Sequence, residues 1–324
     1  MISGFALRVD GGVQTFNTIE QAVEQANRQG ATFWIDLDKP TVEELSGIGE
    51  ALGLNSEALE DCLEGEQRPR LDEFEDHIFL LLYGMVGPKE SDAVGPRQLT
   101  AFCGRNYLIT AHVAPLRTIQ NMKKRCERRP DRVLSEGIDA LLHSIIDGMA
   151  DVYVGLADQY EERVDELEDR SLEPDVEQDV LQEAVAFRKE LVGLRHLALS
   201  QRELLTPLSS GDCDYVSDSL GVRFSHVRDH LTKVIELIDS QRERLSMVRD
   251  NYHTALANRT NEIMKTLTLF ATLVLPLSLI AGVYGMNVEL WPPADSPSSF
   301  YIILVGMAAA AALLLYYFRR KYWI

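Results

Sequence analysis

The sequence TLTLFATLVLPLSLIAGV occupies residues 266–283, and SSFYIILVGMAAAAALLLYYF occupies residues 298–318. Neither stretch contains a charged residue. At a rise of about 1.5 Å per helical residue they would span about 27 and about 31 Å, which is close to the thickness of the hydrocarbon core of a bilayer. We therefore predict two transmembrane helices, joined by a short external loop at residues 286–297.

Basic residues around the two stretches predict their orientation. Arg259 and Lys265 flank the start of the first stretch, and Arg319, Arg320 and Lys321 follow the second, whereas the loop between them has no lysine or arginine. Because basic residues favour the cytoplasmic side, we expect both termini in the cytoplasm and the chain in the inner (plasma) membrane. The N-terminus does not have the pattern of a secretory signal peptide. The expected boundaries are residues 264–285 and 298–318 for the two transmembrane helices and 319–324 for a basic tail.

The rest of the chain is strongly acidic. The 324 residues include 50 acids and 32 bases, giving a net charge of −18, while the mean hydropathy of −0.10 is ordinary. Nearly all of the negative charge lies in residues 1–263. We expect no nucleic-acid partner, because such proteins bind phosphates through lysine and arginine. The sequence shows no nucleophile, nucleotide or cofactor motif, so we do not expect an enzyme, and its four cysteines lack zinc-site spacing.

Residues 1–130 mix the periods of strands and helices. The alternation at residues 31–38 predicts a half-buried strand, and residues 78–86 and 99–113 predict further strands, with a turn at residues 103–106. Thr41 and Glu44 have the spacing of a capping box, and Asn55 favours another helix start. We expect a cytoplasmic α/β domain with helices packed on a mixed sheet.

From residue 135 onward the apolar residues follow a helical period, which predicts a long-helix stalk, or funnel, over residues 131–263. The stalk contains an acidic helical hairpin, which we expect to break at Pro174. The hairpin is either an ordinary solvated surface or a surface that concentrates cations near a pore, and the sequence leaves both open. Residues 222–275 contain no proline or glycine, so the last helix should enter the membrane without a linker, and residues 222–283 would form a rod of about 90 Å. The predicted fold class is an α+β membrane protein.

The chemically distinctive motif lies at the end of the first apolar stretch, where Tyr284 is followed by Gly285, Met286 and Asn287. Gly285 permits a sharp exit from the helix, and Asn287 then places an amide oxygen at the membrane surface. A ring of such oxygens around an axis would suit a hydrated cation, and Mg²⁺ gives up its water reluctantly. A single two-helix hairpin has no conduit of its own, so transport would require several copies.

Four stretches together resemble the CorA family of magnesium channels. They are NEIMKTLT at residues 261–268, LPLSLIAGVYGMN at 275–287, QRPRLDEF at 67–74 and LLHSIIDGMAD at 141–151. The resemblance implies a homopentamer with the first membrane helix lining the pore and the second outside it. It also implies that Gly285, Met286 and Asn287 form the selectivity filter, with Asp250 at the cytoplasmic pore mouth.

The resemblance further implies a set of pore-lining residues on the first membrane helix: Asn261, Met264, Leu267, Thr268, Ala271, Leu275, Ser278 and Gly282. Apart from the neighbours Leu267 and Thr268, gaps of three or four residues keep these positions on one helix face. The spacing alone would also fit ordinary helix packing. The polar members offer oxygens to a cation, and the apolar members could close the pore by dewetting.

Regulatory metal ligands are also implied by the resemblance. They are Glu60, Asp61, Asp147 and Asp151, and one partner position is His226 instead of a carboxylate. Mg²⁺ prefers oxygen, whereas imidazole suits Zn²⁺, Co²⁺ or Ni²⁺. The implied site is therefore weaker for Mg²⁺, shifted to Asp229 or tuned to a softer metal. The sequence alone equally fits four ordinary surface carboxylates and an ordinary surface or core histidine at position 226. The loop after Asn287 also departs from the family pattern, although Glu289 still provides an acid at the pore entrance.

The sequence thus predicts a passive Mg²⁺ channel in the lipid bilayer, driven by the membrane potential and closed by internal metal that bridges the subunits. A first alternative is a transporter of Zn²⁺, Co²⁺ or Ni²⁺ on the same fold, such as the ZntB branch. A second is a scaffold or sensor for which the two membrane helices are only an anchor. The polar residues between Asn261 and Gly282 disfavour the second, because an anchor does not need them.

Overall fold

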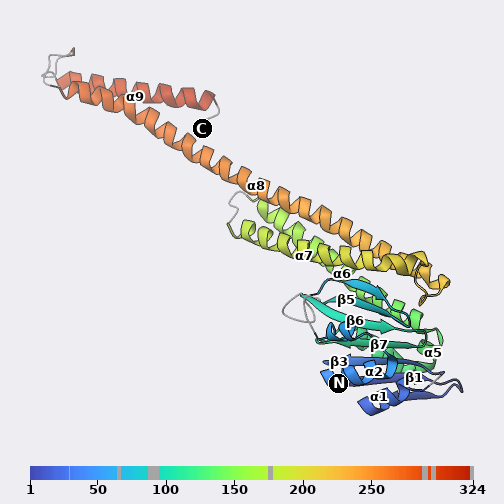
Figure 1. Cartoon of the computed structure of the whole chain (residues 1–324). Helices are drawn as coiled ribbons and strands as arrows, with labels where there is room; N and C mark the ends of the chain where they lie inside the picture. Colours follow the sequence, from blue (N-terminus) through green and yellow to red (C-terminus); the bar gives the residue numbers. More distant parts are fainter. Residues whose placement is uncertain are drawn as a thin grey trace. The chain divides into compact units, whose positions relative to one another are not determined.

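The computed structural model describes residues 1–28, 30–63, 67–86, 95–173, 178–286, 291–292 and 297–321. The chain divides into two compact units (Figure 1). Unit 1 comprises Met1–Arg170 and Gln178–Val248, and unit 2 comprises Ser171–Glu177 and Arg249–Ile324.

The described residues form seven strands and nine helices. The strands are β1 (Ile2–Leu7), β2 (Val13–Phe16), β3 (Thr32–Asp38), β4 (Arg70–Glu73), β5 (Ile78–Val86), β6 (Gly95–Cys103) and β7 (Tyr107–His112). The helices are α1 (Ile19–Ala26), α2 (Val42–Leu52), α3 (Ser56–Glu60), α4 (Arg117–Arg128), α5 (Pro130–Ser135), α6 (Ile138–Ser171), α7 (Gln178–Ser210), α8 (Asp218–Tyr284) and α9 (Pro297–Arg320).

The strands form one mixed sheet in the order β2-β1-β3-β7-β6-β5-β4. β3 and β7 are parallel neighbours, and all the other neighbouring pairs are antiparallel. The strands predicted at residues 31–38 and 78–86 are confirmed as β3 and β5, and β6 and β7 confirm the predicted hairpin. The capping box of Thr41 and Glu44 is also confirmed, because each side chain accepts a hydrogen bond from the backbone N–H of the other.

The sheet has helices on both faces. Phe33, Ile35 and Leu37 of β3 belong to a buried cluster that also contains side chains of α1, α2 and α3. Side chains alternate between the faces of a strand, so Trp34 and Asp36 point the other way, and Asp36 meets Lys123 of α4 there. The result is an N-terminal α/β domain with a core on each side of the sheet.

Helices α6, α7 and α8 pack against one another within unit 1. The ring of Tyr160 on α6 meets the ring of Phe187 on α7 edge-on, with centroids 4.8 Å apart. Gln241 on α8 is buried and donates a hydrogen bond of 2.8 Å to the backbone carbonyl of Ala157 on α6. α6 ends at Ser171 and α7 begins at Gln178, so there are two long helices here, as predicted, and the predicted break point, Pro174, lies outside the described residues.

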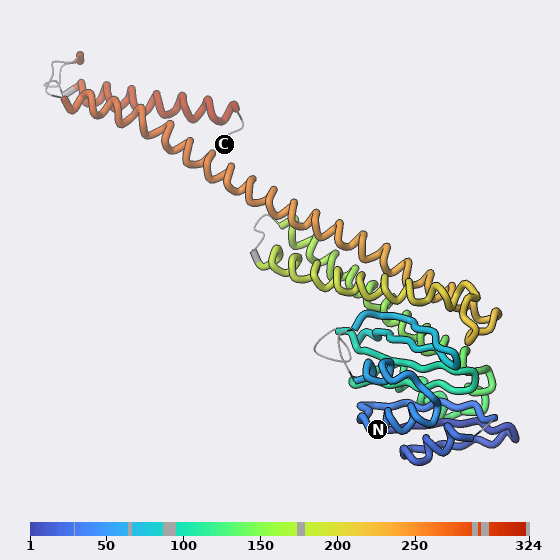
Figure 2. Tube along the Cα trace, in the orientation of Figure 1, coloured from blue at the N-terminus to red at the C-terminus, as the bar shows by residue number. Residues whose placement is uncertain are grey.

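In the part of the chain that the structure describes, three helices are long and apolar enough to cross a membrane: α6, α8 and α9. In the most apolar 18-residue stretch of α6, 61% of the residues are buried inside the structure, so α6 is a core helix of unit 1. The corresponding stretches are 0% buried in α8 and 6% buried in α9. α9 reverses the direction of α8 (Figure 2). The fold therefore consists of an N-terminal α/β domain, long helices and two C-terminal apolar helices, as predicted.

Candidate ion pathway and metal sites

The predicted pore positions form a regular row along the part of α8 that lies in unit 2. Starting at Asp250 and passing through Thr254 and Ala257, the spacing alternates between four and three residues as far as Gly282. An average spacing of 3.5 residues is the repeat of helices that pack around a common axis. Only Leu267 lies beside the row, next to Thr268.

This row is exposed in a single chain. Asp250 and all eight predicted pore-lining residues are classed as exposed, and large apolar members such as Met264 and Leu275 are 55% and 68% exposed. Apolar side chains of this size normally lie against other helices or lipid. The face is therefore incomplete without further molecules around it.

The polar members of the row can accept hydrogen bonds. The hydroxyl of Thr268 donates to the backbone carbonyl of Met264 at 2.7 Å, so its proton is occupied and its oxygen still offers a lone pair. Asn261 and Ser278 contribute an amide and a hydroxyl at other levels of the same row. Water molecules around a cation point their oxygens at the ion and their hydrogens outward, so these side chains match a hydrated cation.

α8 ends where the motif predicts a turn. The N–H of Gly285 donates to the carbonyl of Ala281 at 2.9 Å, and the N–H of Met286 donates to the carbonyl of Val283 at 3.2 Å. A Cβ atom at Gly285 would lie 3.2 Å from the Ala281 carbonyl oxygen, which explains why glycine suits this position. Asn287 and Glu289 lie outside the described residues.

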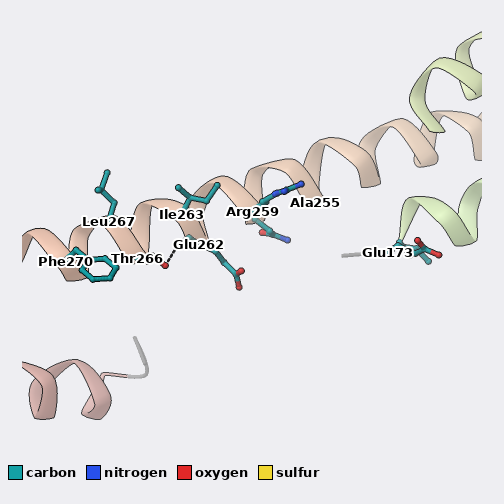
Figure 3. Close-up of a pocket in the computed structure, with 10 residues that line it drawn as sticks. Glu173, Ala255, Arg259, Glu262, Ile263, Thr266, Leu267 and Phe270 are labelled. Carbon is teal, nitrogen blue, oxygen red and sulfur yellow. Dashed lines mark hydrogen bonds between the residues drawn. The ribbon is translucent and has the colours of Figure 1, made fainter. Parts of the chain in front are cut away.

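The opposite side of α8 bears a groove of about 900 Å³ (Figure 3). Ala255, Arg259, Glu262 and Thr266 line it, each two residues before a member of the predicted pore row. A two-residue offset is about 200° around a helix, so these four residues face away from the row. Leu267, a predicted pore-lining residue that lies beside the row, also lines this groove. The lining changes from charged at Arg259 and Glu262 to uncharged beyond Ile263, as expected where a helix enters a membrane.

The predicted regulatory acid Asp61 is engaged within its own chain. It follows α3, and its carboxylate forms an ion pair with Arg70 at the start of β4 and accepts a hydrogen bond from the amide of Gln67. Arg70 also pairs with Asp72, its Nε lying 2.7 Å from the carboxylate. These partners outweigh the cost of burial and raise the pKa of the Arg70 guanidinium. Glu60, one residue earlier, is exposed.

The second predicted acidic pair lies on α6. Asp147 is half-buried and Asp151 is exposed, one helical turn apart. His143, one turn before Asp147, is buried, and its ring meets that of Phe224 on α8 edge-on, with centroids 5.0 Å apart. Burial lowers the pKa of His143, while the charges of both Asp147 and His226 also act on it. Asp147 thus lies one turn after His143 on α6, and His226 lies two residues after Phe224, the α8 residue whose ring meets His143.

Within the described ranges of one chain, no three histidine, cysteine, aspartate or glutamate side chains are grouped so as to hold a metal ion. Glu60 is the last residue of α3 and Asp61 follows it, whereas Asp147 and Asp151 lie on α6 and His226 lies on α8. The carboxylates fit a hard cation such as Mg²⁺ in chemistry, but a complete site requires ligands from elsewhere.

Two residues near the predicted sites, Arg70 and His143, were not themselves predicted as site residues. Arg70, which engages Asp61, belongs to the QRPRLDEF stretch, whose basic residues give no sign of which acid they contact. His143 was visible in sequence as the residue four before Asp147, on the same helix face.

Comparison with known proteins identifies relatives over nearly the whole chain. Residues 29–320 match the sequence model of the family described as CorA-like Mg²⁺ transporter protein. YfjQ of Bacillus subtilis is 30% identical over 276 residues, which cover 85% of this chain and 84% of that protein. The cobalt/magnesium transport protein CorA of Thermotoga maritima is 28% identical over 277 residues, covering 86% and 79%. The complete structure of the CorA magnesium transporter from Methanocaldococcus jannaschii shares the fold, with a TM-score of 0.86 at 24% identity over 100% of this chain and 99% of that chain.

Proposed function

This chain belongs to the family of CorA-like Mg²⁺ transporter proteins, and we propose that it is a passive Mg²⁺ channel assembled from several copies around a water-filled axis. The family is one of membrane transporters of divalent cations and not of enzymes. The observation that carries the more specific proposal is the exposed row on α8, which alternates three- and four-residue gaps and combines oxygen-bearing with apolar side chains.

The pore is formed by this row, with five copies of α8 around the axis and α9 outside. Asn261, Thr268 and Ser278 hold hydrated cations, while Met264, Leu267 and Leu275 form the constrictions that close. Asp250 forms an acidic ring at the cytoplasmic mouth. Its side chain is 67% exposed, and its ion-pair partner among the described residues is the adjacent Arg249, at 3.1 Å.

The selectivity filter is formed by Gly285, Met286 and Asn287, and Glu289 attracts divalent cations to the entrance. Its support is the turn at Gly285, which ends α8 just before Asn287. With both termini in the cytoplasm of a cell bounded by an inner (plasma) membrane, an inside-negative potential of about 100 mV favours entry of a divalent ion by about 4.6 kcal/mol.

Internal metal closes the channel by binding between copies, at Glu60 and Asp61 of one and at Asp147, Asp151 and His226 of another. In a single chain the carboxylate of Asp61 is held by Arg70, so a metal ion at Asp61 competes with that guanidinium. The closed state must bind the metal more tightly than the open state, because the difference in affinity sets the shift. The division into a domain at 1–130 and a stalk at 131–263 that transmits this change is part of the same proposal.

Flux into proteoliposomes tests the transport proposal. Uptake of Mg²⁺ that follows the imposed potential is expected, and Asn287→Ala should abolish its selectivity over other cations. Unchanged Mg²⁺ selectivity in Asn287→Ala would show that the filter lies elsewhere. Absence of any ion flux would favour a scaffold or sensor.

A transporter of softer metals is the second candidate, because an imidazole, His226, occupies a predicted ligand position. Uptake of Zn²⁺, Co²⁺ or Ni²⁺ with little Mg²⁺ uptake, in competition assays, would favour it.

The gating proposal is tested with Asp61→Asn/Asp147→Asn, which should keep the channel open at high internal Mg²⁺. Asp72→Asn is the matched control, because it removes the other carboxylate partner of Arg70 and leaves both proposed ligands in place. Normal closure of the double variant would contradict the assignment of these ligands.

A further inference from the structure

A concentration of positive charge lies in unit 1, apart from the proposed pore and the proposed metal ligands. A groove of about 520 Å³ lies between the C-terminal half of α4 and α5, which is labelled in Figure 1. Its lining includes the amide side chain of Asn121 and five basic side chains, which are Lys124, Arg125, Arg128, Arg129 and Arg132. The two acids of the same segment, Glu127 and Asp131, do not line it. The volume lies within the range of small-molecule sites, about 300–1,000 Å³.

The packing of α4 against the core makes its basic side chains point outward. Ile119, Met122 and Cys126 are buried on the side of α4 that faces the core. Lys123 forms an ion pair with Asp36 of β3, whose side chain is 0% exposed. The helix is thus fixed to the sheet by apolar contacts and by a buried ion pair, and the side chains of Lys124, Arg125 and Arg128 are exposed on its other side.

The five basic side chains do not have ion-pair partners among the described carboxylates. Seven arginines elsewhere in unit 1 are paired with acids, which are Arg28, Arg70, Arg163, Arg170, Arg195, Arg242 and Arg244. Other arginines, such as Arg105 and Arg202, have no ion-pair partner among the described carboxylates, so what distinguishes the groove is that five basic side chains line one cavity. In a chain with 50 acids and 32 bases, a groove with five basic residues and no acid in its lining is unusual. The five like charges repel one another, and a bound anion would relieve that repulsion.

We propose that this groove binds a compact oligophosphate anion, such as the phosphate chain of a nucleoside triphosphate. Four of the five cations are arginines, whose planar guanidinium groups bind phosphate oxygens through paired hydrogen bonds. Several cations in one groove match an anion with several charges better than a single carboxylate or chloride.

Two features of the chain disfavour a nucleic acid as the ligand. The groove lining contains no aromatic side chain on which a base could stack. The net charge of −18 repels an extended polyanion, whereas a compact anion contacts only the basic groove.

Calorimetric titration of the full-length protein in detergent, with sodium tripolyphosphate and with ATP as separate probes, tests the proposal. We expect saturable binding of tripolyphosphate, tighter than that of orthophosphate at equal ionic strength. Arg129→Gln/Arg132→Gln should weaken it by roughly tenfold for each arginine removed. Comparison of ATP with tripolyphosphate shows whether the nucleoside adds affinity.

The matched control is Arg188→Gln/Lys189→Gln, which removes the same charge from exposed positions on α7 and should leave binding unchanged. Arg129→Lys/Arg132→Lys keeps the charge but removes the paired hydrogen bonds, and it should lose an intermediate amount of affinity; it also serves if the glutamine variant does not fold. Equal losses in the groove and control variants, or no saturable binding, would overturn the proposal. It would also be overturned if the groove variant bound tripolyphosphate normally but lost binding to vesicles of anionic lipid, or dissociated into single chains.

Discussion

α8 has two regions with the same periodicity and different surroundings. Up to Val248 it carries a row of buried side chains with alternating gaps of four and three residues: Leu220, Phe224, Val227, Leu231, Val234, Ile238, Gln241, Leu245 and Val248. From Arg249 to Tyr284 none of its described side chains is buried. Periodicity therefore predicts that a helix has a packing face, but it does not tell whether the partner belongs to the same chain.

A pair of phenylalanines on α8 tests this comparison most strongly. Phe224 is 0% exposed, whereas Phe270 is 64% exposed. We expect Phe224→Ala to lower the free energy of unfolding of unit 1 by about 3–5 kcal/mol, because it leaves a cavity among packed helices. Phe270→Ala should leave the unfolding transition of unit 1 unchanged. Denaturant titration of the full chain, followed by circular dichroism, measures both, and equal effects would contradict the contrast.

A buried ion pair provides the next test within unit 1. Lys123→Met removes the partner of the buried Asp36 carboxylate, which also accepts a hydrogen bond of 2.6 Å from Thr110 and lies 3.3 Å from His112. Removing one member of a buried pair is expected to cost about 3 kcal/mol of stability. Thermal unfolding at neutral pH measures this loss, with Lys124→Met, an exposed neighbour, as the control.

The pKa of Asp36 gives the same pair a dependence on pH. Burial opposes ionisation, but the hydrogen bond and charge of His112 and the charge of Lys123 together lower the pKa of Asp36. A carboxyl pKa that is lower in the folded than in the unfolded state stabilises the fold above the unfolded value, about 3.9. This contribution should be lost as the pH falls below about 4, and Asp36→Asn should remove that part of the acid dependence.

The sequence predicted local elements better than the contacts between them. β3, β5 and the β6–β7 hairpin follow from alternation and turn residues that lie close together in sequence. The order of the sheet depends on the pairing of β3 with β7, more than 70 residues away, and local periodicity carries no information about it. The hairpin of β1 and β2 was also not predicted, since β2 has only four residues and only one of them, Phe16, is buried.

In the candidate site, too, the sequence predicted features within one helix but not contacts between elements. The row from Asn261 to Gly282 could be identified from spacing, together with the family resemblance, because all its members lie on one helix. The engagement of Asp61 by Arg70 could not, because nine residues and a change from helix to strand separate them. The groove on α4 and α5 follows from the burial of the opposite helix face, which only the fold reveals.

Substitution of a buried histidine should change the stability of unit 1 by less than the substitutions above. His77 is 2% exposed, its ring stacks on Phe74 with centroids 4.9 Å apart, and neither ring nitrogen has a hydrogen-bond partner among the described atoms. Burial lowers the pKa of His77, although the charge of Asp76 opposes this. A lowered histidine pKa stabilises the fold above the unfolded value, about 6.5, and stability falls as the pH drops below it. The wild-type protein should lose up to about 1.4 kcal/mol of its free energy of unfolding per pH unit below 6.5, and His77→Phe should remove this loss. The same decline of unfolding free energy with falling pH in both proteins would contradict this.

The smallest expected effect separates the two faces of α8 within unit 2. Thr266 and Thr268 are chemically identical, and each hydroxyl donates to the carbonyl four residues earlier, at 2.9 and 2.7 Å. Thr268 lies in the proposed pore row, whereas Thr266 lines the groove on the other side. Valine keeps the shape but removes the oxygen that would accept a hydrogen bond from the water around a cation. Thr268→Val should therefore lower Mg²⁺ flux in proteoliposomes by roughly fivefold, corresponding to a hydrogen bond of about 1 kcal/mol, and Thr266→Val should leave it unchanged. If Thr266→Val reduced flux and Thr268→Val did not, the pore would lie on the groove side of α8, and the assignment of the two faces would have to be exchanged.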